Sequence, residues 1–219
     1  MAKLILVPTP IGNLDDITLR SIKVLEKAEV IFAEDTRVTR RLLDHLGLKN
    51  TVISFHSQNE HRQLDQVVRK IQEVTYAVLV SDAGTPGISD PGFLLVRACI
   101  QEGISIECLP GPTAFVPALV ASGLPCDKFV FEGFLPHKKG RQTRWKALAE
   151  EERTIVLYES PHRINKLLKQ FQEFIHPERQ IAVIREISKM FEEVKRGNIQ
   201  ELIDISESKE LKGEIVVVV

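Results

Sequence analysis

Short apolar runs recur along the first half of the chain, with helical or turn-rich segments between them. The runs lie at 4–7, 30–33, 52–54, 77–80 and 104–108. Each run is nearly continuous in apolar residues, which is typical of a strand covered on both faces. Between the third and fourth runs, Leu64, Val67, Val68 and Ile71 fall at i, i+3, i+4 and i+7, on one face of a helix. This alternation predicts a mostly parallel sheet for residues 1 to about 115.

A second series of apolar runs follows a short turn-rich stretch. These runs lie at 129–131, 154–158, 181–184 and 215–219. Ile164, Leu167, Leu168 and Phe171 repeat the helical spacing between two of them. The stretch at 121–125, ASGLP, separates the two series and is rich in turn formers. We therefore expect an α/β protein with two α/β domains, residues 1–118 and 119–219.

Two dipeptides that end in proline predict helix starts. Asp90–Pro91 and Ser160–Pro161 each place a residue favoured at the N-cap before the residue favoured at the first helical position. We therefore expect helices to begin directly after Asp90 and directly after Ser160.

Composition narrows the class of protein and the class of partner. Of the 219 residues, 43% are hydrophobic and 27% are charged, which is typical of a soluble globular protein. The net charge of −1 gives no overall field that draws the chain onto nucleic acid, so a polyanion needs a local basic patch. No segment is a continuous apolar run long enough to span a bilayer, and the first apolar run is too short for a signal peptide. We therefore expect a cytoplasmic protein with no membrane segment.

Cysteine and histidine spacing gives no signal for a metal site or a disulfide framework. Cys99, Cys108 and Cys126 form no CxxC pair and are odd in number. The six histidines include no HExxH motif. We therefore expect neither a structural metal nor disulfide bonds.

Turns rich in glycine and proline follow three of the predicted strands. They lie at 8–13, 81–92 and 110–114. The carboxyl ends of parallel strands meet at one edge of a sheet, so the three turns predict one shared pocket. The first of these turns contains no GxGxxG, and the chain contains neither GxxxxGK[ST] nor GxSxG. The pattern therefore favours a ligand that needs shape and backbone carbonyls more than a phosphate cradle.

Six motifs follow one another along the chain: VPTPIGN at 7–13, AEDTR at 33–37, SDAGTP at 81–86, GPTA at 111–114, FEGFLP at 131–136 and ESPHR at 159–163. Together they closely resemble the ribosomal RNA small subunit methyltransferase I family, the ribose 2′-O-methylating branch of the tetrapyrrole methylase superfamily. The resemblance covers practically the whole chain. It implies two α/β domains of the tetrapyrrole methylase type, S-adenosylmethionine in the cleft between them, and a homodimer. It also implies methylation of a cytidine ribose in the decoding region of 16S rRNA.

The resemblance also implies which residues bind the cofactor. The turn after the fourth strand would wrap the methionine part, the other two turns would line the site, and two residues of the second domain would reach the adenosine side. These residues are Asp82, Ala83, Gly84, Thr85 and Ile88, then Pro10, Ile11, Thr113 and Ala114, and finally Glu159 and Ser188. Glycine lets main chain approach a ligand closely, and carbonyls with Asp82 suit the cationic ammonium and sulfonium. A merely tight connection between strand and helix explains residues 90–92 but not 82–87.

Methyl transfer from a sulfonium is an in-line displacement that needs no metal and no covalent enzyme intermediate, so the enzyme must align the 2′-oxygen and relay its proton. The carboxylate candidates are Glu159, Glu186 and Asp35. Arg37, Arg163 and Arg185 are candidates for positioning a phosphate or stabilising a developing oxyanion. Two plainer interpretations stay open: residues 34–37 as a capped helix start, and Arg185 with Glu186 as a surface ion pair.

The segment 137–146, HKKGRQTRWK, holds five Lys or Arg in ten positions and the single tryptophan. It is the best candidate for contact with RNA phosphates. Trp145 fits either a stacking face for a base or a helix core position shared with Leu148. The RNA-binding candidates are Lys138, Lys139, Arg141 and Arg144, with Asn13 and Arg37 from the first domain.

Two other functions remain open on the sequence alone. Methylation of a tetrapyrrole or another small molecule shares the fold and the cofactor, but it leaves the basic segment 137–146 without a role. A catalytically silent module that binds the cofactor or RNA predicts binding without turnover.

Overall fold

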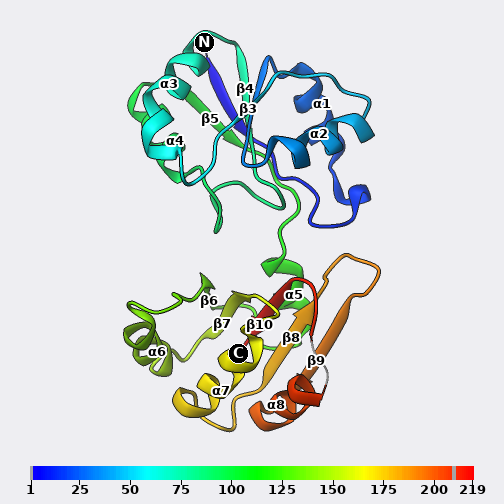
Figure 1. Cartoon of the computed structure of the whole chain (residues 1–219), viewed down its shortest axis with the longest axis vertical. Helices are drawn as coiled ribbons and strands as arrows, with labels where there is room; N and C mark the ends of the chain where they lie inside the picture. The colour runs from blue at the N-terminus through cyan, green and yellow to red at the C-terminus, as the bar shows by residue number, and fades with distance from the viewer. Residues whose placement is uncertain (1, 209–210) are drawn as a thin grey trace. The chain divides into compact units, whose positions relative to one another are not determined.

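The computed structural model describes residues 2–208 and 211–219 (Figure 1). By its contacts the chain divides into unit 1, residues 1–113, and unit 2, residues 114–219. The boundary predicted after residue 118 falls inside helix α5 (Phe115–Ser122). Ala118 and Leu119 of this helix pack in a core with side chains of the second sheet, so the whole of α5 belongs to unit 2.

Unit 1 is built on a sheet of five strands, all parallel, in the order β3-β2-β4-β1-β5. This confirms the parallel sheet predicted from the apolar runs. The strands are β1 (Lys3–Leu6), β2 (Val30–Ala33), β3 (Val52–Ser54), β4 (Tyr76–Val80) and β5 (Ser105–Cys108). The helices are η1 (Leu14–Asp16), α1 (Leu19–Lys27), α2 (Thr36–His45), α3 (Glu60–Gln72) and α4 (Phe93–Gln101).

Consecutive side chains of β1 and of the residue after it, Val7, belong to two different cores. Leu4 and Leu6 pack with side chains of α3 and α4, whereas Ile5 and Val7 pack with side chains of α1 and α2. Figure 1 shows the two helix pairs on opposite sides of the sheet. Because both faces are covered, the strands need no polar alternation, which explains why their sequences are continuous apolar runs.

Unit 2 is built on a mixed sheet in the order β6-β7-β10-β8-β9. Its strands are β6 (Phe129–Phe134), β7 (Thr154–Glu159), β8 (Ile181–Arg185), β9 (Glu193–Gly197) and β10 (Ile215–Val218). Helix α5 covers one face, and α6 (Arg141–Ala149), α7 (Ile164–Phe174) and α8 (Ile199–Ser208) cover the other. The apolar pattern missed β9 because this edge strand is polar, as edge strands exposed to solvent often are.

Trp145 lies in the core of unit 2. Trp145 has no exposed surface, and its ring packs edge-on against Phe171 and stacks against Phe174. The core interpretation of this residue is therefore confirmed, and the stacking face for a base is excluded. The side chain belongs to the helical face that also carries Leu148.

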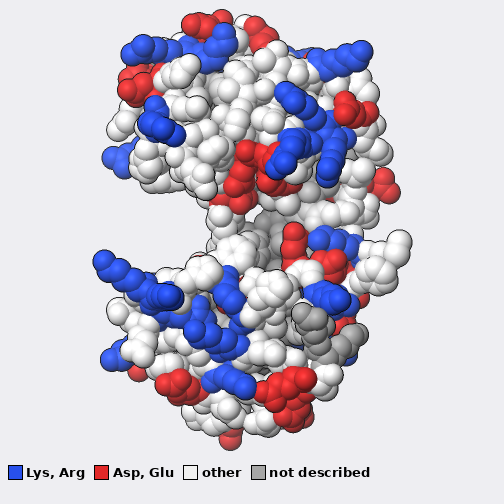
Figure 2. Space-filling view, viewed as in Figure 1, with Lys and Arg blue, Asp and Glu red and all other residues white. Residues whose placement is uncertain are grey.

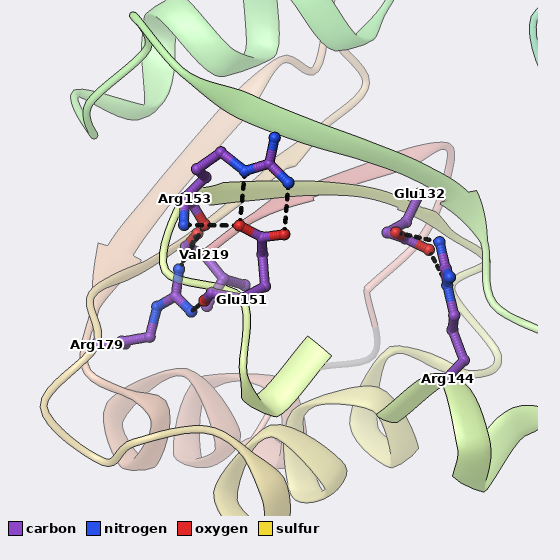
Figure 3. Close-up of polar contacts among 6 residues, drawn as sticks. All are labelled: Glu132, Arg144, Glu151, Arg153, Arg179 and Val219. Atoms are coloured by element: carbon purple, nitrogen blue, oxygen red, sulfur yellow. Dashed lines mark hydrogen bonds and ion pairs between the residues drawn. The ribbon is translucent and has the colours of Figure 1, made fainter. Parts of the chain in front are cut away.

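A guanidinium ties the end of the chain to the start of β7 (Figure 3). Arg179 donates to the backbone carbonyls of Glu151, Arg153 and Val219. Glu151 accepts in turn from the guanidinium of Arg153, at 2.7 Å from Nε to Oε1, and these hydrogen bonds lower the pKa of Glu151 to about 2. The last residue is thereby held at the edge of the sheet where β7 begins.

Two helix starts differ from the predictions. Helix α4 begins at Phe93, with Gly92 at the N-cap and a φ of 136°, and α7 begins at Ile164, with Arg163 at the N-cap. Asp90 and Ser160 therefore lie before the caps, and both predicted starts are wrong. At these starts the Gly92 amide donates to Glu60 Oε1 at 3.2 Å, and Ser160 Oγ accepts from the Arg163 side chain at 3.2 Å.

None of the described helices is long and apolar enough to cross a membrane.

Candidate functional site

The turns after β1 and β4 are joined directly at the carboxyl edge of the first sheet. Thr9 and Gly84 form an antiparallel bridge, with each amide donating to the other's carbonyl at 2.9 Å. The buried Thr9 hydroxyl also donates to the carbonyl of Ser81 at 3.0 Å, and Ser81 Oγ donates to the Gly84 carbonyl at 3.2 Å. These bonds fix the main chain of two turns that lie about seventy residues apart in the sequence.

The turn after β5 joins the same group. Thr85 Oγ1 donates to the carbonyl of Pro112 at 3.2 Å. Gly84 has a φ of +83°, and a Cβ added there would lie 3.6 Å from Cγ2 of Ile11 and 4.0 Å from Cα of Thr113. Gly84 therefore lies where the three turns meet, in a backbone conformation that favours glycine. The structure brings together the three turns that the sequence analysis assigned to one pocket.

The remaining predicted cofactor residues of unit 1 differ in exposure. Ile11 is buried and Pro10 is half-buried, whereas Ala83 and Ile88 are exposed in the turn after β4. Asp82 is half-buried, and its Oδ1 accepts the backbone amide of Asp35 at 2.8 Å. This bond ties the β4 turn to the first residues of α2.

Three carboxyl groups gather at this edge, from the ends of β2 and β4. Burial first, then the charges of Glu34 and Asp82, raises the pKa of Asp90 to about 7. Burial and the charge of Asp82 likewise raise the pKa of Glu34, against a smaller opposing effect of His56. The charges of these groups act on one another, so they lie close together, and a cation placed among them would relieve their repulsion. We call Glu34, Asp82 and Asp90 the acidic group.

In unit 2, Glu159 ends β7 as a buried carboxylate that is only partly satisfied. Its side chain is 1% exposed, and Oε1 accepts from Arg163 Nη2 and from the Ser160 amide, both at 2.7 Å. Oε2 is buried and has no hydrogen-bond partner within residues 2–208 and 211–219. A buried oxygen of this kind is an acceptor that is available to a ligand.

The guanidinium of Arg163 is held on three sides. Besides Glu159, its Nε donates to Ser160 Oγ at 3.2 Å, and Nη1 lies 3.0 Å from Nε2 of His137. Arg141 lies near both members of the Glu159–Arg163 pair, since their charges act on its pKa. It is 5% exposed and donates to Gln170 and to the carbonyl of Pro136. Two guanidinium groups thus surround one buried carboxylate at the carboxyl ends of β6 and β7.

Arg185 ends β8 at the same sheet edge as Glu159, because both residues pair with Ile215 of β10. Its Nε donates to Glu193 at 2.9 Å, and Nη1 donates to the carbonyl of Lys212. The predicted interpretation as one ion pair with Glu186 does not match these contacts.

The turn after Arg185 contains two residues in left-handed conformations. Glu186 and Ser188 have φ values of 52° and 65°. Glu186 Oε1 accepts from the Glu214 amide at 2.9 Å and from Lys189 Nζ at 3.0 Å, and the first of these bonds contributes most to lowering its pKa. The Ser188 amide donates to Glu192 at 2.7 Å. The carboxylate of Glu186 is thus engaged in shaping the turn.

The predicted RNA-binding residues of segment 137–146 fall into three kinds. Lys138 and Lys139 are exposed, and neither forms an ion pair with any residue that the structure describes. Arg144 is paired with the carboxylate of Glu132 through two hydrogen bonds (Figure 3). Arg141 is buried, so the structure does not place it on the surface with the two lysines.

The two predicted RNA-binding residues of unit 1 also have local partners. Asn13 is the N-cap of η1, and its Oδ1 accepts the Asp15 amide at 3.1 Å. Arg37 is exposed and pairs with Asp35, with 2.6 Å between Nη2 and Oδ2. Hydrogen bonds from the side chain and amide of Arg37 lower the pKa of Asp35 to about 2. Asp35 also caps α2, as the interpretation of residues 34–37 as a capped helix start proposes.

Several residues of the site were not singled out from the sequence. Thr9 and Ser81 hold the turns together, and Asp90 and Glu34 complete the acidic group. The signal for Thr9 is its place between two prolines, where the backbone is already restricted. The proximity of Glu34 and Asp90 had no local signal, because Glu34 directly follows β2 whereas Asp90 lies in the long turn between β4 and α4. Within the described residues, no three His, Cys, Asp or Glu side chains are arranged to hold a metal ion.

The remaining predicted cofactor residue, Ala114, is the N-cap of α5 and the first residue of unit 2. The predicted cofactor residues are therefore divided, with those of the three turns up to Thr113 in unit 1 and Ala114, Glu159 and Ser188 in unit 2.

Comparison with known proteins gives likenesses over the whole chain. A family model described as "Tetrapyrrole (Corrin/Porphyrin) Methylases" matches residues 3–203. A Thermotoga maritima protein named "Ribosomal RNA small subunit methyltransferase I" is 44% identical over 218 residues, which cover 100% of this chain and 98% of the relative. A Synechocystis protein of the same name is 46% identical over 220 residues, which cover 100% of this chain and 79% of the relative.

Solved structures share the fold at lower identity. The methyltransferase CobJ gives a TM-score of 0.73 at 19% identity, covering 100% of this chain and 93% of that one. Uroporphyrin-III C-methyltransferase from Thermus thermophilus, complexed with S-adenyl homocysteine, gives a TM-score of 0.66 at 18% identity, covering 99% of this chain and 96% of that one. At these identities the structural likeness establishes the fold and nothing more specific.

Proposed function

Because the chain belongs to the tetrapyrrole methylase family and, within it, to the ribosomal RNA small subunit methyltransferase I proteins, we propose that it methylates 16S rRNA. The methyl group would come from S-adenosylmethionine and go to the ribose 2′-oxygen of a cytidine in the decoding region. The observation that carries this proposal is the likeness, along the whole length of this chain, to relatives with that name. The fold alone leaves open the methylation of a tetrapyrrole or another small molecule.

Several features of the chain fit S-adenosylmethionine. When bound, this cofactor would supply a methyl group whose carbon an oxygen nucleophile can attack without a metal, with the sulfur leaving as a neutral thioether. In unit 1, Gly84 lets the main chains of three turns meet closely. Asp82, Ala83, Thr85 and Ile88 would form the wall of the site with Pro10, Ile11 and Thr113. The acidic group raises the local preference for cations, as an ammonium and a sulfonium require.

In unit 2, Glu159 is the residue that we expect to contact a ligand most directly. Its buried Oε2 lacks a donor within the described residues, so an N–H or O–H group of a ligand would satisfy it. Ala114 and Ser188 would line the same ligand. We propose that this fixed acceptor binds the adenosine part or the reacting ribose hydroxyl.

Of the three carboxylates that could take the proton of the 2′-hydroxyl, Glu159 is favoured by its contacts. Both oxygens of Asp35 accept from Arg37, and Glu186 Oε1 is engaged by Lys189 and the Glu214 amide. A carboxylate whose pKa is lowered by such bonds is a poor proton acceptor. Glu159 Oε1 also accepts from Arg163 and the Ser160 amide, but its buried Oε2 has no donor within the described residues and is open to a ligand proton. We therefore propose that Glu159 receives or relays the proton and that Arg163 orients it. Arg185 and Glu186 would shape the neighbouring turn.

The rRNA would be held by exposed basic side chains. Lys138 and Lys139 are free to contact phosphates, while Arg144 would need to leave Glu132 to do so. Asn13 and Arg37 remain candidates in unit 1. We further propose that the protein acts in the cytoplasm as a homodimer and without a metal, as the family resemblance implies.

The test is methyl transfer from labelled S-adenosylmethionine to small-subunit rRNA from cells that lack this activity, followed by mapping of the modified nucleotide. We expect one ribose methyl on a 16S cytidine. Glu159→Gln should lower the transfer rate by about a hundredfold or more. Glu151→Gln is the matched control, because it removes the same charge from a guanidinium pair at the opposite end of β7.

Two results would contradict the proposal. Well-folded protein that binds S-adenosylmethionine but methylates no RNA would point to a silent module. Transfer to a tetrapyrrole acceptor in place of RNA would point to a small-molecule methylase. If Glu159→Gln and Glu151→Gln gave equal rates, Glu159 would have no part in the reaction.

A further inference from the structure

The exposed side of helix α2 carries three arginines, and we propose that this surface is a second contact for the phosphate backbone of rRNA. The inference rests on the proposed function and adds a binding surface on unit 1. We call Arg37, Arg40 and Arg41 the arginine face. All three side chains are exposed, and they lie at i, i+3 and i+4 on one helix.

The arginine face keeps a net positive charge, because its three arginines are accompanied on α2 by one acidic residue, the exposed Asp44 at i+4 from Arg40. Arg37 pairs with Asp35, but Arg40 and Arg41 form no ion pair with any residue in 2–208 or 211–219. The spacing places like charges beside one another on the helix surface, which destabilises a helix when no anion is present. Solvated helix faces ordinarily mix both signs of charge. Binding of a polyanion would offset the repulsion among these arginines, which gives a reason for their placement on one face of α2.

The arginine face is fixed relative to the cofactor turn of its own unit. Asp35 caps α2 by accepting the Arg37 amide, and the Asp35 amide donates to Asp82 Oδ1 at 2.8 Å. The same helix packs on the sheet through the buried residues Leu42 and Leu43. A phosphate bound along α2 would therefore be held at a constant position relative to the β4 turn.

Opposite charges lie side by side on this part of unit 1. Figure 2 shows Lys and Arg side chains gathered over α1 and α2, with Asp and Glu side chains beside them on the same face of unit 1. The acidic group lies at the sheet edge where β2 leads into α2. A polyanion is attracted to the arginine face and repelled from the acidic group, which suits a cationic ligand instead. The phosphate backbone would thus bind to α2 at this edge of the sheet and leave the acidic group free for a cationic ligand.

Arginine is also the appropriate residue for this contact. Its guanidinium keeps its charge and offers paired N–H donors that match phosphate oxygens. In segment 137–146 the two arginines are engaged elsewhere, with Arg141 buried and Arg144 bound to Glu132. The arginine face therefore provides free guanidinium groups, whereas segment 137–146 provides free lysines.

The test is the salt dependence of binding to a 16S rRNA fragment that contains the modified cytidine. Arg40→Gln/Arg41→Gln removes two charges and keeps polar side chains on the helix surface. The matched control is Arg62→Gln/Arg69→Gln on α3, which packs against the opposite face of the sheet. Both control arginines are exposed and form no ion pair with the residues described.

We expect the slope of log K against log salt concentration to fall in magnitude by about 1.4–1.8 in the α2 variant, at about 0.7–0.9 per phosphate contact. The control variant should keep the wild-type slope, and both variants should bind S-adenosylmethionine with unchanged affinity. An unchanged slope in the α2 variant, or an equal fall in the control, would overturn the inference. Weakened binding to intact small subunits but not to the RNA fragment would also overturn it, since it would indicate a ribosomal protein as the partner. If wild-type protein neither bound nor methylated rRNA, the proposed function itself would fail.

Discussion

Replacement of Arg163 by methionine tests whether the Glu159–Arg163 pair behaves as a buried ion pair. The Glu159 side chain is 1% exposed and that of Arg163 is 20% exposed, with 2.7 Å between Oε1 and Nη2. Methionine keeps most of the apolar stem of arginine but removes the charge and every donor. Glu159 would retain only the Ser160 amide as a donor among its observed partners, and Oε2 would stay without one.

Breaking a buried ion pair by removing one partner costs about 3–5 kcal/mol, because the remaining charge stays buried without compensation. We therefore expect Arg163→Met to lower the free energy of unfolding of unit 2 by about this amount. The double variant Glu159→Gln/Arg163→Met removes both charges. It should lose clearly less stability than Arg163→Met alone, because a neutral amide is less costly to bury than a carboxylate.

Urea unfolding followed by tryptophan fluorescence suits this measurement. Trp145 is the single tryptophan of the chain and is fully buried in the core of unit 2, so its emission reports the unfolding of that unit. The control is Arg153→Met, which breaks an exposed pair with Glu151 in the same unit and should change the midpoint little. The reasoning is refuted if Arg163→Met is no more destabilising than this control, or if the double variant is as unstable as the single one.

Two further predictions concern the turns of unit 1. Gly111→Ala would place a Cβ 2.7 Å from Cβ of the rigid Pro8 ring, so we expect a loss of about 1–3 kcal/mol. We also expect weaker binding of S-adenosylmethionine by calorimetry. Gly103→Ala is the control: it strains the backbone at a φ of +70° but meets no atom within 4 Å, so it should bind normally. Equal affinities would show that the contact between the turns is not needed. Asp90 has an ordinary pKa of 3.8 and a folded pKa of about 7, so its protonated form stabilises the fold at low pH and this contribution is lost as pH rises through about 7. Asp90→Asn should therefore reduce the fall in melting temperature between pH 5 and pH 8, and an unchanged fall would exclude Asp90 as its cause.

The predicted elements succeeded where the pattern was local. The apolar runs of unit 1 form strands whose neighbouring residues, such as Leu4 and Ile5, face opposite cores. Both faces must therefore be apolar, and this shows in the sequence as a continuous apolar run. Strand β9 escaped prediction because an edge strand with Lys195 and Arg196 carries no continuous apolar run. The starts of α4 and α7 were misplaced: the N-caps are Gly92 and Arg163, and Asp90 and Ser160 lie before them in turns.

The candidate site was predictable to the extent that it depends on the backbone. The glycine and proline residues in three turns after parallel strands predicted that these turns lie together, and the turns do meet around Gly84. The carboxylates Glu34 and Asp90 were not predicted to influence each other, since they lie in turns that are far apart in the sequence, after β2 and before α4. Their pKa values depend on burial and mutual charge, which only the folded chain establishes.

By itself, the sequence determined the fold class, the two series of strands and the turns that gather at one sheet edge. Each of these depends on the periodicity and backbone preferences of neighbouring residues. The tertiary structure alone decided which charged side chains are free to act. Arg141 is held by Gln170, Glu186 by the amide of Glu214, and Arg144 by Glu132. Each partner comes from another part of the chain, so the residue type predicts the chemistry and the fold determines whether it is available.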